Sequence, residues 1–559
     1  MENKIGRQVK KNILLNNIIL IISGAVIFFL AHPNYIFKNG IGVLGYLIYL
    51  PFCLLLKNTN IKNSFFYGGI YGSLSYILFL FWLRNFHPVA LLFIPIYFFV
   101  LYGILFLALK LLEKIYTNYC FILQILCVCI FEYLRTLGFL GFPYGQPGYT
   151  QWQFIPLIQL SNITGISGLN LLVIIPGFLI AKIIELKKSK NKTRSIMRPV
   201  LLTGSVWICL FIFSLIYGIV CINKYVKIES QSGKITAALI QNNEHPWENG
   251  IEAHNKNVNN LIELSNKAMK ENNAELIVWP ETSVAPSILY HFYKMDNSPR
   301  FVLAYKIINF MLSSEADFVI GNVNKTVDKN GKEENTNSVL HFSPGKNVFP
   351  PEPVMYSKQH LVPLSESFPW ENIFPKIAEI LKNGSPDFWE AGKENVVFNF
   401  KDLSFVTPVC FEDTFGNDCR KMILDLKNQK DEENNHFEKN HGAALINLSN
   451  DSWSESLVCQ KQHLSMAVFR SAENNIPSVR STTSGQTAYI NGTGKVVKEL
   501  APFCSNYLIC EIPVIATNSM TFYTAHGDLF SVLIIICFSA LLIIRLITVI
   551  MKKLKINKQ

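Results

Sequence analysis

Charged residues are scarce in this sequence. Asp, Glu, Lys and Arg make up 16% of its 559 residues, whereas 50% are hydrophobic, and soluble globular domains carry about 25% charged residues. This shortage excludes a wholly soluble protein, and the length excludes one ordinary domain. The composition therefore indicates a membrane protein with more than one domain.

The sequence also lacks the patterns of a metal site and of a disulfide framework. No close group of His, Cys and Asp has zinc-like spacing, and we expect no metal or other cofactor. Seven of the twelve cysteines lie in or at the ends of apolar segments, where cysteine packs as a small hydrophobe. Five cysteines remain: Cys410, Cys419, Cys459, Cys504 and Cys510. Because five is an odd number, at least one thiol stays free unless a pair forms between chains.

Long uncharged stretches are abundant instead. A bilayer core needs roughly 20 apolar residues per helical span, and eight segments approach or exceed this length: about 13–31, 41–56, 65–83, 88–109, 119–134, 165–184, 200–222 and 528–550. The first lacks a small-residue cleavage site and is followed at once by further segments, so it is not a cleavable signal peptide. We therefore expect about eight membrane-spanning helices.

Lys and Arg are concentrated in alternate loops between these segments. Short loops rich in these residues stay in the cytoplasm, which places both chain ends and the basic segment 187–198 there. The predicted domains are a bundle of about seven helices over 1–222, an extracytoplasmic domain over 223–527, and a last helix with a basic tail over 528–559. Because part of the net charge of +11 comes from Lys and Arg in cytoplasmic loops, this charge gives little support for a nucleic-acid partner.

From residue 234 the pattern changes to short β-rich runs that alternate with polar helical stretches. Residues 251–272 and 461–475 have apolar positions at helical spacing. The predicted strands are 234–241, 274–281, 317–323, 339–345, 403–410, 442–450 and 478–491. Strands that alternate with helices indicate a layered α/β domain.

Three polar residues each follow a predicted strand of this domain. Glu281 ends LIVWPE, Lys358 follows VMYS, and Cys410 ends FVTPVC. Chemistry in α/β sheets gathers beyond the carboxyl ends of strands, and a base, a cation and a thiol are the parts of a cysteine nucleophile. The alternative stays open at this point, because a lone cysteine is more often a packed hydrophobe and a lone Glu or Lys a solvated charge.

Several motifs resemble two known families. WPE (279–281), KQHLVPLSE (358–366), CFED (410–413) and NLSNDSW (447–453) resemble the Glu-Lys-Cys signature of the nitrilase superfamily. FEYLR (131–135) and GFPYGQPGY (141–149) resemble the membrane half of bacterial apolipoprotein N-acyltransferases. The resemblance implies an integral membrane α-helical bundle of about eight spans joined to an extracytoplasmic α/β nitrilase-like domain, an α-β-β-α sandwich, in the bacterial cytoplasmic (inner) membrane.

The resemblance also implies an activity. An acyl chain would move from a phospholipid, typically phosphatidylethanolamine, to the α-amino group of the diacylglyceryl-cysteine that begins an apolipoprotein. By motif position, Glu281 would be the general base, Cys410 the nucleophile that forms a thioester, and Lys358 the cation that stabilises the oxyanion. This is the last step of lipoprotein maturation.

Five further residues match supporting positions of the family. Glu366 would orient Lys358 or relay protons, Glu412 matches the glutamate after the nucleophile, and Asn337 would be local scaffolding. Phe411 stands where the family has Tyr, so a hydroxyl role there is absent. Trp453 ends NLSNDSW and is followed by Ser-Glu-Ser in place of the family's Phe-Gly, a change expected to affect substrate preference; Asn450 and Asp451 are expected to cap the segment that follows.

Several alternatives remain open on the sequence. The chain could be a membrane-tethered amidase or nitrilase-type hydrolase, or a transporter or receptor, although a transporter predicts ionisable or broken sites deep within its spans. Segment 367–389 is either an amphipathic cover of the core or a membrane-dipping arm that admits lipid. Glu132 and Arg135 form either an ion pair at the membrane edge or a contact with a phospholipid headgroup.

The topology makes a direct prediction. Reporter fusions at residues 192 and 330 should fall on opposite sides of the membrane, because residue 192 lies in the most basic internal loop and residue 330 in the predicted extracytoplasmic domain. A reporter that is active only outside the cytoplasm should therefore work at residue 330 and fail at residue 192. Activity of that reporter at both positions would contradict the topology.

Overall fold

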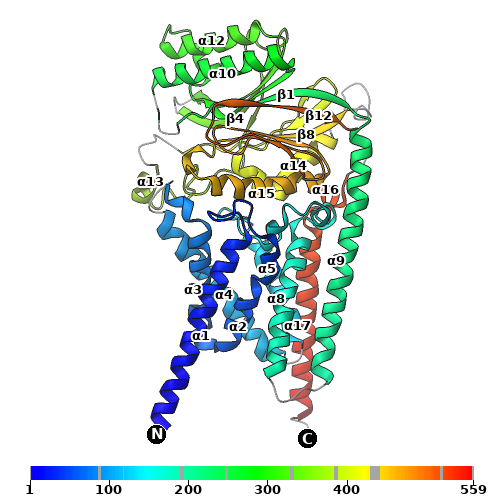
Figure 1. Ribbon diagram of the computed structural model, residues 1–559. Helices are drawn as coiled ribbons and strands as arrows, with labels where there is room; N and C mark the ends of the chain where they lie inside the picture. The colour runs from blue at the N-terminus through cyan, green and yellow to red at the C-terminus, as the bar shows by residue number, and fades with distance from the viewer. Residues whose placement is uncertain are drawn as a thin grey trace. The chain divides into compact units, whose positions relative to one another are not determined.

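The computed structural model describes most of the chain (Figure 1). The described residues are 2–85, 90–116, 119–188, 194–245, 248, 250–327, 331, 333–382, 388–428, 441–516 and 520–556. The chain forms two compact units, residues 1–220 with 526–559 and residues 221–525. Parts of the basic segment 187–198 and of the C-terminal tail lie outside the described ranges, as do residues 192 and 330.

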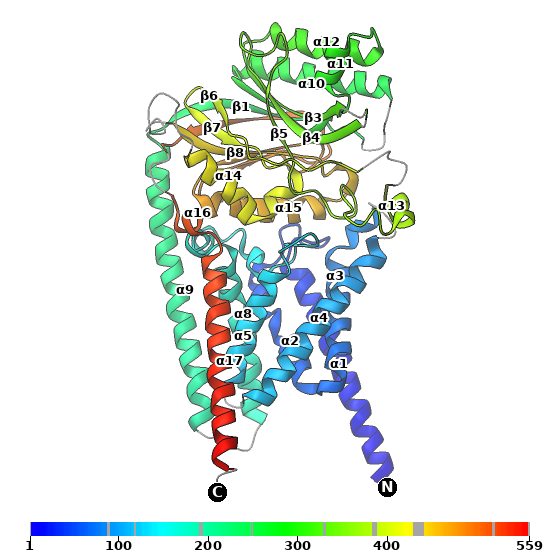
Figure 2. The same ribbon diagram turned by 180° about the vertical axis from the view of Figure 1, so that it is seen from behind.

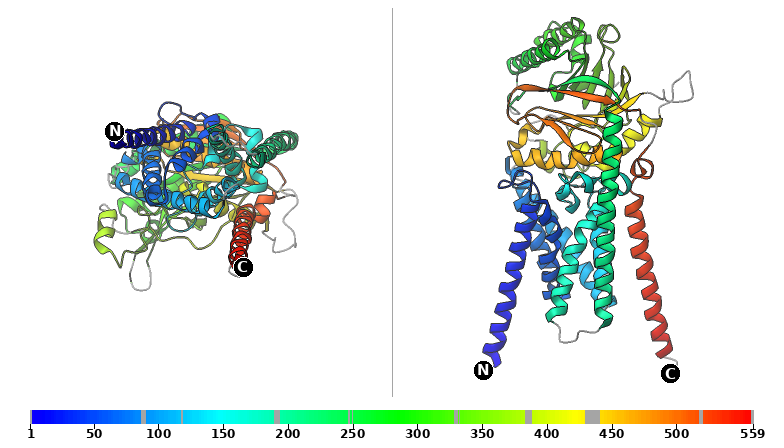
Figure 3. Two further views of the ribbon diagram at one scale, coloured as in Figure 1. Left: turned by 90° about the horizontal axis from the view of Figure 1, so that it is seen from below. Right: turned by 45° about the vertical axis from the view of Figure 1, so that its right-hand side comes forward.

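The unit of residues 1–220 and 526–559 is helical. Its longer helices are α1 (Glu2–Ala31), α2 (Tyr49–Asn58), α3 (Ile61–Phe79), α4 (Ala90–Ile115), α5 (Cys120–Leu134), α8 (Ile166–Lys188), α9 (Arg194–Glu229), which continues into the other unit, and α17 (Leu529–Ile556). Short turns of helix connect them: η1 (Gly42–Leu47), η2 (Phe81–Asn85), η3 (Pro147–Gln151), α6 (Ile155–Ile158) and α7 (Ser161–Thr164). Helices α1 and α17 each form one long rod that carries a chain end (Figure 3).

Within the described ranges, five helical segments are long and apolar enough to cross a membrane: Lys11–Ala31, Leu91–Ile115, Ile166–Lys188, Met197–Glu229 and Leu529–Met551. Gly42–Asn58 and Cys120–Leu134 are apolar but shorter, and the expected span 65–83 falls largely on α3. The prediction of several apolar helices is confirmed. The number of eight spans stays a prediction.

Helices α3 and α4 pack closely through glycine. A Cβ atom added to Gly68 would lie 2.5 Å from the ring of Phe106, and one added to Gly72 would lie 2.6 Å from Tyr102. These two glycines are one helical turn apart, so they share a face of α3. Small residues at this spacing let two helix backbones approach where no hydrophobic effect drives association, which is typical of helices in membranes.

The buried pair Glu132 and Arg135 fixes the loop 141–149. Arg135 Nε donates to Glu132 Oε2 at 2.8 Å, and Arg135 Nη1 donates to the carbonyls of Phe142 at 2.7 Å and Tyr144 at 3.0 Å. Both charged side chains are 1% exposed. A headgroup would need an accessible face of the guanidinium, so the geometry favours the ion-pair interpretation.

The unit of residues 221–525 contains two six-stranded sheets. The first has the order β12-β1-β2-β3-β4-β5, and its strands are β1 (Gly233–Gln241), β2 (Leu276–Val284), β3 (Asp317–Val327), β4 (Glu333–Phe342), β5 (Val354–Ser357) and β12 (Asn506–Val514). The second has the order β11-β10-β9-β8-β7-β6, with β6 (Phe398–Phe400), β7 (Leu403–Val406), β8 (Gly442–Ser449), β9 (Ser478–Thr482), β10 (Ala488–Ile490) and β11 (Val496–Glu499). Its strands β6, β7 and β8 are labelled in Figure 2.

The two sheets pack face to face and helices cover their outer faces (Figure 1). The shared core joins Leu239 and Val278 of the first sheet to Phe405 and Leu445 of the second. The outer helices of the first sheet are α10 (Ile251–Asn272), α11 (Ile288–Lys294) and α12 (Pro299–Leu312), and those of the second are α14 (Gly416–Asn428) and α15 (Leu457–Asn474). This arrangement confirms the predicted α-β-β-α sandwich.

The central strands of each sheet are parallel, so their carboxyl ends lie at the same end of the sheet and bring together segments that are distant in the sequence. Strand β2 lies between β1 and β3 in parallel, and β8 lies between β7 and β9 in parallel. These central strands are buried on both faces, which explains their nearly continuous apolar sequences such as LIVW and AALI. Glu281 lies within the last residues of β2 (Leu276–Val284), and the carboxyl end of β7 leads to the segment that carries Cys410.

Some predicted element boundaries are wrong. Strand β7 ends at Val406 rather than at Cys410; Pro408 lacks the N–H that a ladder needs, and only Val409 bridges to Leu448 before Cys410 begins the 3-10 turn η4 (Cys410–Thr414). The predicted strand 478–491 is a β9–β10 hairpin. All twelve cysteines lie within the described ranges, and each is free.

The segment 367–389 presents apolar side chains to its surroundings. Its helix α13 spans Pro375–Lys382, and residues 383–387 lie outside the described ranges. Phe368 is buried, but five large apolar side chains are 39% to 66% exposed: Trp370, Ile373, Phe374, Ile377 and Ile380. A cover of the core would bury these side chains, so the exposure favours the membrane-dipping interpretation.

Replacement of both Trp370 and Phe374 by Ser should slow the lipid-dependent acylation expected at Cys410 and leave the melting temperature nearly unchanged. Exposed side chains contribute within about 0.5 kcal/mol to stability, whereas they would supply the apolar contact with lipid. The measurement compares acylation in phospholipid vesicles with thermal unfolding.

The matched control is Phe368→Ala, a buried aromatic of the same segment. It should lower the free energy of unfolding by about 3–5 kcal/mol. An equal loss of stability and acylation in the Trp370 and Phe374 double variant would favour the core-cover interpretation instead.

Candidate active site

The structure brings Glu281, Lys358 and Cys410 together from three elements. Lys358 Nζ lies 3.4 Å from Glu281 Oε1, and the Cys410 thiol lies close enough to the Glu281 carboxylate for each to shift the pKa of the other. Their exposed fractions are 5% for Glu281, 1% for Lys358 and 9% for Cys410. A base, a cation and a thiol therefore lie together inside the domain, although the sequence separates them widely.

An irregularity within β2, rather than the end of a strand, sets the direction of the Glu281 side chain. The ladder between β2 and β3 shifts between Trp279 and Val284, and Thr282 has a φ of 46°. A Cβ on Gly321 of β3 would lie 2.2 Å from the Pro280 carbonyl oxygen, so only glycine allows this approach. Residues 280–283 of β2 face the single residue Gly321 of β3. Extra residues in a strand bend it and change the direction of the local side chains, which here turns Glu281 toward Lys358.

Lys358 directly follows β5, as predicted, and its ammonium is held by two carboxylates. Nζ donates to Glu366 Oε1 at 2.8 Å as well as to Glu281. Glu366 in turn accepts the Val362 N–H through Oε2 at 2.7 Å, which fixes the carboxylate. The backbone of Lys358 is anchored on both sides, since its N–H donates to the Asn337 carbonyl and its own carbonyl accepts the Gly392 N–H.

Burial and charge set the protonation states of the three groups. Burial alone would lower the pKa of Lys358, but the Glu366 and Glu281 carboxylates raise it above the ordinary value. Burial and the charge of Glu366 raise the pKa of Glu281, against the opposing effects of Lys358 and Asn337. Burial and Glu281 also raise the pKa of the Cys410 thiol well above its usual range. The resting thiol therefore holds its proton next to a strengthened carboxylate base.

Cys410 occupies a strained turn. Its φ of 47° lies in the left-handed region, which disfavours a residue with a Cβ by roughly 1–2 kcal/mol. The turn persists because Glu412 closes it: the Val409 N–H donates to Glu412 Oε2 at 2.7 Å, and the Glu412 N–H donates back to the Val409 carbonyl at 3.0 Å. Strain of this kind gathers at functional sites.

Glu412 also ties the nucleophile turn to the lysine segment. Its Oε1 accepts the backbone N–H groups of Gln359 at 2.8 Å and His360 at 3.0 Å, and the Tyr356 hydroxyl lies at 2.9 Å and 3.0 Å from its two oxygens. Because Gln359 follows Lys358 and Val409 precedes Cys410, one buried carboxylate fixes the distance between both reactive residues.

The remaining predicted residues take different places. Asn337 lies within β4, and its Nδ2 donates to Glu281 Oε1 at 2.7 Å. Phe411 packs edge-on against Phe415, with ring centroids 4.9 Å apart, and so contributes an apolar wall. Trp453 lies half-buried in η5 (Ser452–Ser454), shortly after β8.

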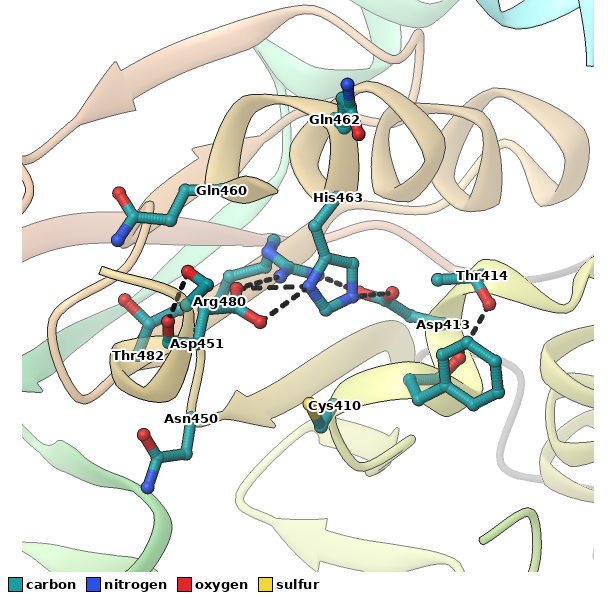
Figure 4. A network of polar contacts seen from close by, with 12 residues as sticks. Cys410, Asp413, Thr414, Asn450, Asp451, Gln460, Gln462, His463, Arg480 and Thr482 are labelled. Carbon is teal, nitrogen blue, oxygen red and sulfur yellow. Dashed lines mark hydrogen bonds and ion pairs between the residues drawn. The ribbon is translucent and has the colours of Figure 1, made fainter. Parts of the chain in front are cut away.

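A second buried cluster lies beside Cys410 and was not predicted from the sequence (Figure 4). His463 of α15 lies between two carboxylates: its Nε2 is 2.8 Å from Asp413 Oδ1, and its Nδ1 is 3.0 Å from Asp451 Oδ2. Arg480 of β9 pairs with Asp413 and lies 4.0 Å from Asp451. The capping role expected for Asp451 is wrong, because its side chain makes no capping hydrogen bond; Asn450 accepts the Ser452 N–H instead. The only signal was a histidine among apolar residues in 461–475.

This geometry suits covalent acyl chemistry on sulfur. A carboxylate can take the thiol proton, and an ammonium can stabilise negative charge on an attacked carbonyl oxygen. The sandwich and these side chains define a domain of the carbon-nitrogen hydrolase class, and the family model described as carbon-nitrogen hydrolase matches residues 236–520. A second model, described as apolipoprotein N-acyltransferase N-terminal domain, matches residues 23–179.

Two relatives extend over nearly the whole chain. Apolipoprotein N-acyltransferase 1 of Treponema denticola is 38% identical over 531 residues, which cover 92% of this chain and 94% of that protein. Apolipoprotein N-acyltransferase 1 of Treponema pallidum is 34% identical over 525 residues, with 92% of each chain covered. The chain belongs to the apolipoprotein N-acyltransferase family. Among solved structures, Saccharomyces cerevisiae Nit3, a member of branch 10 of the nitrilase superfamily, is 17% identical with a TM-score of 0.34 and covers 53% of this chain and 95% of that chain, a likeness too small to argue from.

Replacement of Glu412 by Gln should separate positioning from simple packing. The amide puts N–H donors where the carboxylate accepts backbone N–H groups, and each lost charged hydrogen bond costs about 1.5–3 kcal/mol. We expect roughly tenfold or slower acylation of Cys410, since about 1.4 kcal/mol in a barrier is tenfold in rate. Acylation is followed by mass spectrometry and stability by thermal unfolding.

Tyr356→Phe is the matched control, because it removes one neutral donor to the same carboxylate. It should cost about 1 kcal/mol of stability and change acylation by less than about threefold. Unchanged acylation in Glu412→Gln would contradict the positioning role.

Proposed function

We propose that this chain is an apolipoprotein N-acyltransferase that moves an acyl chain from a phospholipid, through a thioester on Cys410, to the N-terminal amine of the diacylglyceryl-cysteine of a lipoprotein. The observation that carries this proposal is the buried contact of the Cys410 thiol with Glu281, which itself contacts Lys358, in a chain of this family. An amidase or nitrilase-type hydrolase could share the triad, but the N-terminal family match over 23–179 favours the acyltransferase.

The first half-reaction forms the thioester. Glu281 accepts the thiol proton as the Cys410 sulfur attacks the ester carbonyl of the phospholipid, and Lys358 stabilises the charge on the carbonyl oxygen. The bond between the carbonyl carbon and the glycerol oxygen then breaks, and Glu281 returns the proton to that oxygen. The products are an acyl-Cys410 enzyme and a lysophospholipid.

The second half-reaction forms the amide. The neutral amine of the diacylglyceryl-cysteine attacks the thioester carbonyl, Glu281 takes a proton from the nitrogen, and the carbon–sulfur bond breaks. The sulfur leaves as a thiolate and recovers the proton from Glu281, which restores the starting enzyme. An amide is more stable than the ester and the thioester, so the transfer runs downhill.

The supporting residues act on this machinery without reacting. Glu366 holds the Lys358 ammonium, and Asn337 holds the Glu281 carboxylate through a 2.7 Å hydrogen bond. Glu412 fixes the distance between Lys358 and Cys410 through backbone N–H groups. Phe411 and Trp453 shape the walls around the acyl group, where this chain departs from the family motif.

The place of action follows from composition. Several apolar helices and the family make this a membrane-bound protein. The loops rich in Lys and Arg support the bacterial cytoplasmic (inner) membrane, with residues 223–527 on the periplasmic side. Phosphatidylethanolamine is the proposed donor, and a diacylglyceryl apolipoprotein is the proposed acceptor.

Mass spectrometry of the full chain incubated with phosphatidylethanolamine tests the proposal. We expect an acyl adduct on the peptide that contains Cys410, loss of that adduct in Cys410→Ala, and its discharge by a diacylated lipopeptide with a free N-terminal amine. An adduct that is discharged only by water, or no adduct together with release of ammonia from small amides, would favour the hydrolase.

Cys504→Ser is the matched control for the loss of a thiol. Its Sγ donates to the Ala501 carbonyl at 3.0 Å, a hydrogen bond that a serine hydroxyl can replace. This variant should form the adduct at the normal rate. A loss of the adduct in Cys504→Ser would mean that the Cys410→Ala result does not identify the nucleophile.

A further inference from the structure

Four charged side chains form a buried cluster next to the nucleophile: His463, Asp413, Asp451 and Arg480, here called the His463 quartet. Each is at most 2% exposed. They come from four segments of the catalytic unit, namely α15, the turn η4, the residues after β8, and β9. Figure 4 shows the imidazole ring between the two carboxylates, with Cys410 on the neighbouring turn. No step of the proposed reaction uses these groups.

The contacts of His463 define its charge. Nε2 faces Asp413 Oδ1 at 2.8 Å, and Nδ1 faces both oxygens of Asp451 at 3.0 Å and 3.1 Å. A neutral imidazole has one nitrogen with a lone pair, which would oppose a carboxylate, whereas an imidazolium donates from both nitrogens. His463 is therefore an imidazolium, and the two positive and two negative charges of the quartet cancel.

The quartet also lies against the turn that carries the nucleophile. The His463 ring lies beside the Cys410 carbonyl, and Asn447 Nδ2 approaches the same oxygen at 3.4 Å and the Pro408 carbonyl at 2.9 Å. Because a trans peptide is planar and its C=O and N–H point in opposite directions, fixing the Cys410 carbonyl also fixes the direction of the Phe411 N–H. Asp413 lies in the same 3-10 turn, so the turn is held at both ends.

Charge reaches the Cys410 thiol from several elements. Glu281 of β2 and Asp451 after β8 oppose formation of the thiolate, and Lys358 after β5 favours it. Around His463 stand Asp413, Asp451 and Arg480, and Glu281 acts through space. Without the charge of His463, Asp413 and Asp451 would face Arg480 alone, and the quartet would carry one net negative charge beside the thiol.

We propose that His463 is a positioning residue for the nucleophile: its imidazolium holds the turn that carries Cys410 through Asp413 and cancels carboxylate charge that would otherwise oppose the thiolate. This inference rests on the proposed function, in which Cys410 is the acyl carrier. It differs from a purely structural role because it predicts a change in the pH dependence of the thiol as well as a change in stability.

The test measures the rate of Cys410 alkylation by iodoacetamide against pH, on the full chain in detergent micelles, with the modified peptide quantified by mass spectrometry. In His463→Gln the midpoint of the profile should rise by about one pH unit, which makes alkylation near neutral pH about tenfold slower. An unshifted midpoint in a folded His463→Gln chain would overturn the proposal.

A charge-restoring variant tells electrostatics from loosened packing. His463→Gln combined with Asp451→Asn removes one positive and one negative charge, so the quartet is neutral again, and the midpoint should return to within about 0.3 units of the unaltered chain. A midpoint in the double variant as high as in His463→Gln alone would show that charge balance is not the cause. Asp451→Asn alone serves if His463→Gln does not fold: its midpoint should lie at or below that of the unaltered chain, and a higher one overturns the proposal.

His341→Gln is the matched control. His341 of β4 is also buried and pairs with a carboxylate, since its Nε2 lies 3.0 Å from Asp317 Oδ2, but neither residue belongs to the site. This variant should lose stability without a shift of the alkylation midpoint, and an equal shift would overturn the proposal. Alkylation needs no acyl donor, so the two proposals can fail separately. If the alkylation midpoints shift as expected but the chain forms no acyl adduct, the result counts against the proposed function alone.

Discussion

The buried ammonium of Lys358 is the group on which the rest of the site depends. A fully buried cation is tolerated only when it is paired and hydrogen-bonded, and Glu366 and Glu281 supply that pairing. Loss of one partner of a buried pair costs about 3–5 kcal/mol. The bulge that turns Glu281, the backbone anchors of Lys358 and the Glu412 carboxylate all serve to hold this one charge in place.

The nucleophile lies beside two clusters of different net charge. The Lys358 cluster has two carboxylates for one ammonium, whereas the His463 quartet is balanced. Burial and the Glu281 carboxylate raise the pKa of the Cys410 thiol, so loss of its proton to solvent is costly. In the proposed reaction Glu281 would take this proton during the attack, and the balanced quartet would add no further negative charge beside the thiol.

The parts of the fold that depend on the local pattern of apolar residues could be predicted from the sequence. Apolar runs such as LIVW predicted the central strands, and Lys358 does follow β5. The same pattern placed Cys410 at a strand end because the apolar run continues to that residue, whereas Pro408 ends the ladder and a left-handed turn begins. His463 gave only a weak signal, a histidine among apolar residues, because α15 is buried nearly all round and no polar face marks which of its side chains lie at the site. Asp451 was assigned a local cap because its real partners come from distant segments.

The chemistry of a thioester explains why burial matters more than reactivity at this site. Water and an amine compete for the same carbonyl, and an amine must be neutral to attack. A half-open site would admit water first, whereas Cys410 is only 9% exposed and the ring of the next residue, Phe411, packs against Phe415. A Tyr at position 411 would bring a hydroxyl that needs a hydrogen-bond partner when buried. Phe411 has no such group, so it needs no water beside Cys410. In the proposed transfer, exclusion of water rather than a more reactive thiol would direct the acyl group to nitrogen.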